Sequence, residues 1–214
     1  GVSTAELARR NSDAFQAMQE RLGCSFDRFI RTTDPDHIED RAEYLTKLIG
    51  MRTKAQEAGI WLPHMPPEWG GMGLSHVEMA MVQAEAAKTY YGPWVLNCQA
   101  PDEGNMHTLL HWATPDQAEK YLRPLCEGKA WSCFAMTEPE VAGSDPTLIQ
   151  TRAYRDGDEW VINGHKWFIS NAHRANFAIL IARTEDDPDL PQAANSAFLV
   201  DIPSEGWTEV RQVE

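Results

Sequence analysis

The chain has 214 residues, and its 19 lysines and arginines against 32 aspartates and glutamates give a formal net charge of −13. That length allows one large domain or two modest domains with buried cores. The negative charge would repel a phosphate backbone, so it argues against a nucleic-acid partner.

The sequence carries no signal of a membrane span or of a disulfide framework. No stretch approaches the roughly 18 apolar residues of a membrane span, and the first residues lack the basic-then-apolar order of a signal peptide. We therefore expect no membrane partner. The cysteines form no C-x-x-C pattern, which indicates a reducing cytoplasm rather than a disulfide framework or zinc site. Buried, unpaired thiols are expected at Cys24, Cys98, Cys126 and Cys133.

The first half of the chain has helical patterns. Residues 3–31 have the composition of a long helix, and a second helix is predicted to end near Gly59. Apolar residues recur in this second helix at near-helical spacing: Tyr44, Leu45, Leu48, Ile49 and Met51. Residues 61–74 hold three prolines and three glycines and are expected to form a loop.

Two helix starts can be predicted from capping residues. Ser75 and Glu78 have the spacing of a capping box. Val77, Ala80, Met81 and Ala84 would then lie along one apolar face of the helix that follows. A second capping box is predicted at Thr114 and Gln117, with Pro115 at the first helical position.

The second half changes to an alternating pattern. Asp156-Gly157 and Asn163-Gly164 are hairpin signals, since both turn positions favour positive φ. They predict three antiparallel strands at residues 151–155, 159–162 and 165–170, and two more at 177–183 and 196–202. The expected fold is α+β: an all-α domain over residues 1–132, then an antiparallel β-barrel or sandwich domain over residues 133–214.

The joint between these halves has the sequence FAMTEPEVAGSD, from Phe134 to Asp145. Thr137 offers a hydroxyl and an N–H, and Gly143-Ser144 allows close approach of the main chain, which suits a flat ligand with acceptors along its edge. In the expected strand 165–170, Phe168 and Ser170 would share one face. Each feature has a structural alternative: a turn hydroxyl at Thr137, a helix cap at Ser144 and a core aromatic at Phe168.

From about Arg41 onward the sequence resembles the flavin-dependent acyl-CoA dehydrogenases. The matching text, in the family's order, is MPPEWGGMGLSHVEMA, NCQAPDEGNM, TPDQAEKYLRPLCEG, FAMTEPEVAGSDP and DGDEWVINGHKWFISNA. The resemblance implies FAD as cofactor, bordered by Phe134, Met136, Thr137, Gly143, Ser144, Phe168, Ile169 and Ser170. Thr137 would lie near the pyrimidine edge, Ser144 would touch the cofactor or the substrate's pantetheine arm, and Ser170 would lie near the flavin N5. Phe168 stands where the family usually has a tryptophan.

The implied reaction is oxidation of an acyl-CoA thioester to a 2-enoyl-CoA, with an electron-transfer flavoprotein or a similar acceptor as partner. A homodimer or homotetramer is expected of the full-length protein. In the family the catalytic glutamate lies in a C-terminal helical domain, and this chain corresponds to the front part, so we assign no catalytic residue within it. Glu103 reads as a helix-start charge rather than a base.

Three alternatives stay open at this point. The chain could be a non-catalytic FAD- or CoA-binding module, a fragment completed by another subunit, or a flavin oxidase of the same fold. Residues 3–37 resemble instead a segment of methionyl-tRNA synthetase. His107 and His111 are spaced i, i+4 but have no evident third ligand, so no metal site is predicted.

Overall fold

The computed structural model describes Glu6, residues 41–89, 91–185 and 194–212, with side chains of residues 41–44 left aside. The resemblance of residues 3–37 to a synthetase, the predicted first helix and Cys24 therefore lie outside the described residues, except Glu6. The chain divides into two compact units, residues 1–47 with 214 and residues 48–213. Apart from residues 41–47, every feature discussed below lies in the second unit.

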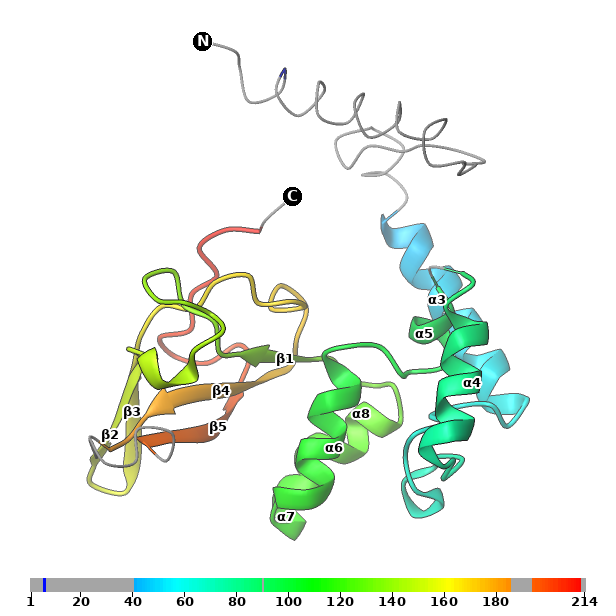
Figure 1. Cartoon of the computed structure of the whole chain (residues 1–214), viewed down its shortest axis with the longest axis horizontal. Coiled ribbons are helices and arrows are strands. Elements are labelled where there is room, and N and C mark those ends of the chain that lie inside the picture. The colour runs from blue at the N-terminus through cyan, green and yellow to red at the C-terminus, as the bar shows by residue number, and fades with distance from the viewer. Residues whose placement is uncertain (1–5, 7–40, 90, 186–193, 213–214) are drawn as a thin grey trace. The chain divides into compact units, whose positions relative to one another are not determined.

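The helices of the first half begin and end largely where the capping residues predict. The helices of the first half include α3 (Arg41–Glu57), α4 (His76–Ala86), α5 (Gly92–Val95) and α6 (Asp102–Trp112) (Figure 1). Ser75 and Glu78 form the predicted capping box at α4. Gly59, just after α3, has the left-handed φ of 69° that glycine tolerates best.

Further along, one helical segment is built from three consecutive pieces. These are α7 (Pro115–Gln117), the π-helical η2 (Ala118–Leu122) and α8 (Arg123–Cys126). Thr114 and Gln117 form the second predicted capping box. The wide η2 turn immediately precedes α8, where Pro124 cannot donate a backbone N–H. Among the described residues no helix is long and apolar enough to cross a membrane.

The apolar face expected along α4 is not the face that is buried. Met79 is buried, whereas Val77 is 73% and Met81 70% exposed. Val82 and Gln83, one turn beyond Met79, are half-buried on the same face. The apolar residues of this helix therefore lie on more than one side, and composition alone could not identify the side that packs.

The second half forms one five-stranded mixed sheet. Its strands are β1 (Ser132–Ala135), β2 (Arg152–Asp156), β3 (Glu159–Asn163), β4 (Phe177–Arg183) and β5 (Asn195–Asp201) (Figure 1). β5 pairs antiparallel along all of β4, while β1 and β2 pair parallel with opposite ends of β4. The all-antiparallel, closed barrel or sandwich expected from the sequence is thus corrected to an open, mixed sheet.

Only one of the two predicted hairpin turns forms. β2 and β3 are antiparallel partners, with Asp156 opposite Glu159 and Gly157 at a φ of 63°. Asn163 instead ends β3, and neither Asn163 nor Gly164 has a positive φ. A Cβ on Gly164 would lie 2.1 Å from Thr151 Oγ1. This glycine therefore permits a close approach of the main chain rather than a turn.

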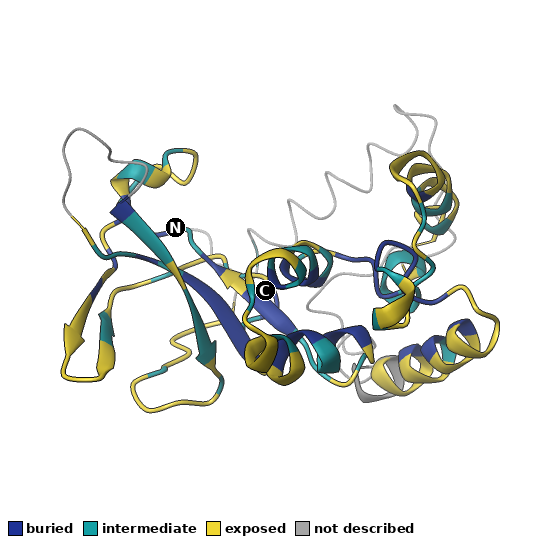
Figure 2. Ribbon diagram, turned by 90° about the horizontal axis from the view of Figure 1, so that it is seen from below, coloured by how far each residue is buried: buried dark blue, intermediate teal, exposed yellow. Residues whose placement is uncertain are grey.

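β4 is buried on both faces, as its continuous apolar run predicts (Figure 2). Phe177 and Ile179 belong to one core cluster, together with residues of α6 and α8 such as Met106 and Leu125. The intervening Ala178, Leu180 and Ala182 belong to a second cluster within the sheet region. Alternation along one strand thus separates the two cores.

A buried polar network joins α6 to β1. Asp102 is 1% exposed and accepts hydrogen bonds from the Ser132 N–H at 2.8 Å and the Ser132 hydroxyl at 2.6 Å. Gln99 donates to the same carboxylate at 2.7 Å, and Asn105 donates to the Ser132 hydroxyl at 2.9 Å. The first residue of the sheet is therefore fixed by the first turn of a helix.

Candidate functional site

The segment that follows β1 carries the first group of predicted site residues. β1 alternates, so Phe134 is 38% exposed between the buried Cys133 and Ala135. Met136 and Thr137 come directly after the strand and are half-buried. These three side chains lie where a sheet strand passes into a loop, a common position for ligand contacts.

The second group, residues 165–170, does not form the predicted strand. The described chain has no regular secondary structure from Gly164 to Ile169, and Ser170 begins a turn. The prediction that Phe168 and Ser170 share one strand face was therefore wrong. Phe168 instead has a left-handed φ of 51°, and its side chain is 63% exposed.

The structure nevertheless brings the two groups together. The Trp167 N–H donates to the Thr137 carbonyl at 3.0 Å. The rings of Trp167 and Phe168 have centroids 4.5 Å apart, and both are more than two-fifths exposed. An exposed pair of aromatic rings thus begins at the residue that bonds to the Thr137 main chain, although no strand pairing creates this contact.

A buried ion pair beside these residues has no counterpart in the sequence prediction. Lys166 Nζ lies 2.8 Å from Glu138 Oε1, and the two side chains are 9% and 4% exposed. Lys166 also donates to the Met136 carbonyl at 2.9 Å. The pair is 28 positions apart in the chain, and no periodic pattern links residues at that separation.

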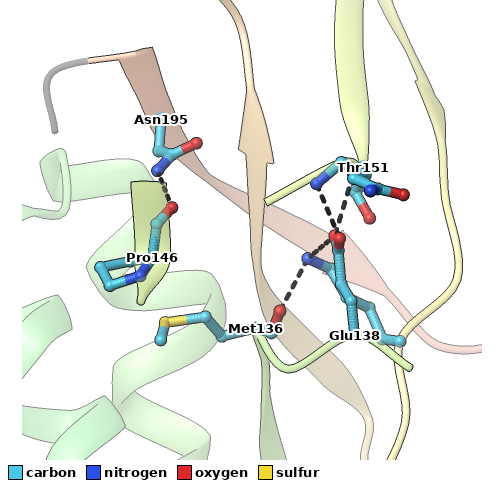
Figure 3. Close-up of polar contacts among 7 residues, drawn as sticks. Met136, Glu138, Pro146, Thr151 and Asn195 are labelled. Carbon is cyan, nitrogen blue, oxygen red and sulfur yellow. Dashed lines mark hydrogen bonds and ion pairs between the residues drawn. The ribbon is translucent and has the colours of Figure 1, made fainter. Parts of the chain in front are cut away.

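The Glu138 carboxylate also accepts hydrogen bonds from backbone N–H groups. Gln150 donates to it at 2.7 Å and Thr151 at 2.9 Å, and Figure 3 shows the carboxylate of Glu138 directed toward Thr151, with Met136 close by. Burial alone would raise the pKa of Glu138, but the hydrogen bonds from Lys166 and from these N–H groups outweigh it and lower the pKa to about 2. Glu138 is therefore a carboxylate at neutral pH.

The loop from Glu138 to Asp145 is tightly folded. A Cβ on Gly143 would lie 3.2 Å from Thr137 Cγ2. Asp145 caps the short η3 helix (Pro146–Leu148) by accepting from the Thr147 N–H at 3.0 Å. The cavity that this loop forms with Met136 and Ile149 has a volume of about 10 Å³, which is room for about one water molecule. A flat ligand would have to lie on the surface of this segment, not inside it.

The remaining predicted site residues are placed as follows. Ser144 and Ser170 are exposed, and Gly143 is exposed beside Thr137. Ile169 is half-buried and packs against the second core cluster. The structure thus brings together Met136, Thr137, Gly143 and the segment at Phe168, whereas Ser144 and Ser170 are exposed beside them.

Residues considered for other chemistry have ordinary surroundings. Glu103 lies in the first turn of α6 and accepts from Gln83 at 3.3 Å, as expected of a helix-start charge. The described residues contain no group of three or more metal-ligating side chains. Cys98, Cys126 and Cys133 are buried and have free thiols, as predicted, and burial raises the pKa of each thiol to about 12.

Comparison with known proteins gives two family matches. The model of the acyl-CoA dehydrogenase N-terminal domain matches residues 16–129, and that of the acyl-CoA dehydrogenase middle domain matches residues 133–214. The first match includes part of the segment that resembles a synthetase.

Relatives and solved structures agree with these matches. The probable acyl-CoA dehydrogenase FadE2 of Mycobacterium tuberculosis is 40% identical over 75% of this chain and 39% of its own length. Human acyl-CoA dehydrogenase family member 11 is 38% identical over 75% of this chain, which is 20% of that protein. The structure of a putative acyl-CoA dehydrogenase from Mycobacterium abscessus has a TM-score of 0.75 and 31% identity, covering 99% of this chain and 50% of the other.

The helical half matches the family's N-terminal domain, and the mixed sheet that follows it lies in the match to the middle domain. The chain belongs to the acyl-CoA dehydrogenase family, whose enzymes are FAD-dependent oxidoreductases. It spans 20% to 39% of the length of the two curated relatives named above.

Proposed function

We propose that this chain forms the flavin-facing part of an enzyme that oxidises an acyl-CoA thioester to a 2-enoyl-CoA. The observation that carries the proposal is the surface made by Thr137 and Phe168, in a chain that matches both family domains in order. FAD, when bound, supplies the acceptor for the hydride from the β carbon. The chain's own residues bind the flavin and orient it.

The residues present fit a flavin in three respects. The Phe168 ring is exposed and offers a face for stacking. Gly143 keeps the loop close to Thr137, since a side chain there would crowd the Thr137 methyl group. The Thr137 hydroxyl can donate a hydrogen bond to an acceptor on the edge of a ring. A phenyl ring at position 168 has no N–H and a smaller stacking area than the tryptophan usual in the family.

Individual roles follow from these positions. Phe134 and Met136 would border the ring system, Thr137 would bind its pyrimidine edge, and Phe168 and Ile169 would form the wall against one face. Gly143 and Ser144 would allow close approach of the cofactor or the pantetheine arm, and Ser170 would lie near N5. No residue of this chain is proposed as the base, and Glu103 is assigned to the helix start, where it accepts from Gln83.

The test is the visible spectrum and FAD affinity of the protein at its natural full length. We expect a bound flavin band that bleaches anaerobically with one of a panel of acyl-CoAs. Phe168→Ala should weaken FAD binding about tenfold, because aromatic stacking contributes roughly 1–3 kcal/mol per base. Tyr154→Ala removes another ring that is 53% exposed, on β2 and outside the candidate set, and should leave the affinity within about twofold.

Three outcomes separate the alternatives. Protein that stays colourless with added FAD contradicts the flavin assignment. Bound flavin that no acyl-CoA reduces favours a binding module, whereas reduced flavin that reoxidises rapidly in air favours an oxidase over transfer to an electron-transfer flavoprotein. Three further expectations stay predictions. They are the domain boundary between residues 132 and 133, the cytoplasmic location, and the homodimeric or homotetrameric state.

A further inference from the structure

The Glu138–Lys166 ion pair connects three segments that meet beside the candidate flavin surface. Lys166 bonds both to the Glu138 carboxylate and to the Met136 carbonyl, at 2.8 and 2.9 Å. The other contacts of that carboxylate are the N–H groups of Gln150 and Thr151. The Glu138–Lys166 pair therefore joins the chain after β1, the entry to β2 and the segment before Phe168; Figure 3 shows Glu138 between Met136 and Thr151.

An ion pair at this depth is not explained by stability alone. Both side chains are at least nine-tenths buried, and removing two charges from water costs about as much as their attraction returns. Apolar residues of similar volume would often serve equally well for folding. What an apolar pair lacks is the set of directed bonds to Met136, Gln150 and Thr151.

Phe168 shows what such directed bonds could maintain. Its left-handed φ is unfavourable for a residue with a side chain, and its ring is too exposed for burial to offset that cost. The backbone is held on one side by Lys166 and by the Trp167 N–H bond to Thr137. On the other side Asn171 also has a left-handed φ, and its side chain bonds to the Ser132 carbonyl at 3.4 Å. Strained, exposed residues held this firmly are typical of ligand contacts.

We propose that Glu138 and Lys166 are positioning residues that hold Phe168 and Thr137 in the relative placement needed to bind the flavin ring. The inference rests on the proposed function, because it assigns the ligand as FAD. Neither residue is proposed to touch substrate or to move a proton. Their effect is transmitted through two backbone connections: Glu138 follows Thr137 directly, and Lys166 precedes Phe168 by two residues.

The experiment measures FAD dissociation constants for the full-length wild type and for Phe168→Ala, Lys166→Met and the double variant that combines them. Lys166→Met should weaken FAD binding about tenfold or more. If Lys166 acts through Phe168, the double variant should bind FAD no more than about twofold more weakly than the weaker single variant. Fully additive losses, or wild-type affinity in Lys166→Met, would overturn the proposal.

Two further variants keep the test decisive if Lys166→Met folds poorly. Glu138→Gln combined with Lys166→Met leaves no lone buried charge, yet it also removes the bond from Lys166 to Met136, so its FAD affinity should fall as well. Lys120→Met breaks an exposed ion pair of similar length, with Asp201 at 2.7 Å, and should leave FAD affinity within about twofold. Wild-type affinity in the charge-free double variant would contradict the positioning role.

A spectroscopic readout separates positioning from a general loss of stability. Visible circular dichroism of bound flavin reports the asymmetry of its surroundings, so Lys166→Met and Phe168→Ala should alter it in the same direction and Lys120→Met should not. A wild type that binds no FAD overturns the proposed function together with this inference. A wild type that binds FAD, and loses affinity in Phe168→Ala only, overturns this inference alone.

Discussion

At the scale of single residues, His64 is buried, and its ring nitrogens make no hydrogen bonds within the described chain. Its side chain is 8% exposed. The ring lies against His107, with centroids 5.1 Å apart. Burial, followed by the charge of His107, lowers the pKa of His64 to about 4. His64 is thus neutral in the folded protein at pH values where an unfolded chain would protonate it.

This shift predicts a pH-dependent stability. Because the unfolded state binds the proton first, the free energy of unfolding should decrease as the pH falls from about 6.5 to about 4, by at most about 1.4 kcal/mol per pH unit. His64→Leu should flatten that dependence, measured from urea unfolding at several pH values. His76→Leu, at an exposed position on α4, is the control and should keep the wild-type slope. Equal slopes in wild type and His64→Leu would contradict the assignment.

At the scale of elements, the segment after β3 shows how a turn signal can be overridden. Asn163-Gly164 favours a hairpin locally, but Lys166 and Trp167 bond to the chain after β1 and draw the segment away from β3. Gly164 passes so close to Thr151 that no side chain fits. The glycine is required by packing between distant segments, and its local preference does not decide the structure.

A pair of glycine substitutions tests this reading. Gly164→Ala should destabilise the protein by about 1–3 kcal/mol, the usual cost of overpacking. Gly104→Ala is the matched control: it lies in α6 with open space around the new Cβ, so it should be neutral or stabilise by up to about 1 kcal/mol. The measurement is the free energy of unfolding in denaturant. A nearly neutral Gly164→Ala would contradict the close approach of Gly164 to Thr151.

At the scale of the whole described unit, one network links the helices to the sheet. Asp102 accepts three hydrogen bonds, two of them from Ser132 at the start of β1. Burial raises the pKa of Asp102, although these bonds and the charge of Arg52 oppose the shift. Asn171 binds the Ser132 carbonyl, so the same strand residue also connects to the segment after Phe168.

Loss of the Asp102 carboxylate should therefore be costly. Asp102→Ala would leave the buried Ser132 and Gln99 donors without their acceptor, and we expect destabilisation on the order of 3 kcal/mol. Asp201→Ala removes an exposed carboxylate that pairs with Lys120, and it should cost less than about 1 kcal/mol. Denaturant unfolding followed by tryptophan fluorescence would compare them. Equal losses of unfolding free energy in the two variants would show that the Asp102 network does not contribute this stability.

The sequence by itself determined the features that depend on neighbours a few positions away. The capping boxes at Ser75 and Thr114, the turn at Gly157 and the two-sided burial of β4 follow from local spacing and composition. The family resemblance and the choice of Thr137 and Phe168 as candidate residues also came from continuous sequence text.

Only the tertiary structure decided what depends on contacts between distant positions. The parallel pairing of β1 and β2 with β4, the buried side of α4 and the Glu138–Lys166 pair all join segments that no local period relates. The conformation of Phe168 belongs to the same group. A strand was the better local prediction for residues 165–170, and the bonds of this segment to Met136, Thr137 and Glu138 overrode it, because pairing the buried Lys166 and Glu138 side chains outweighs weak local preference.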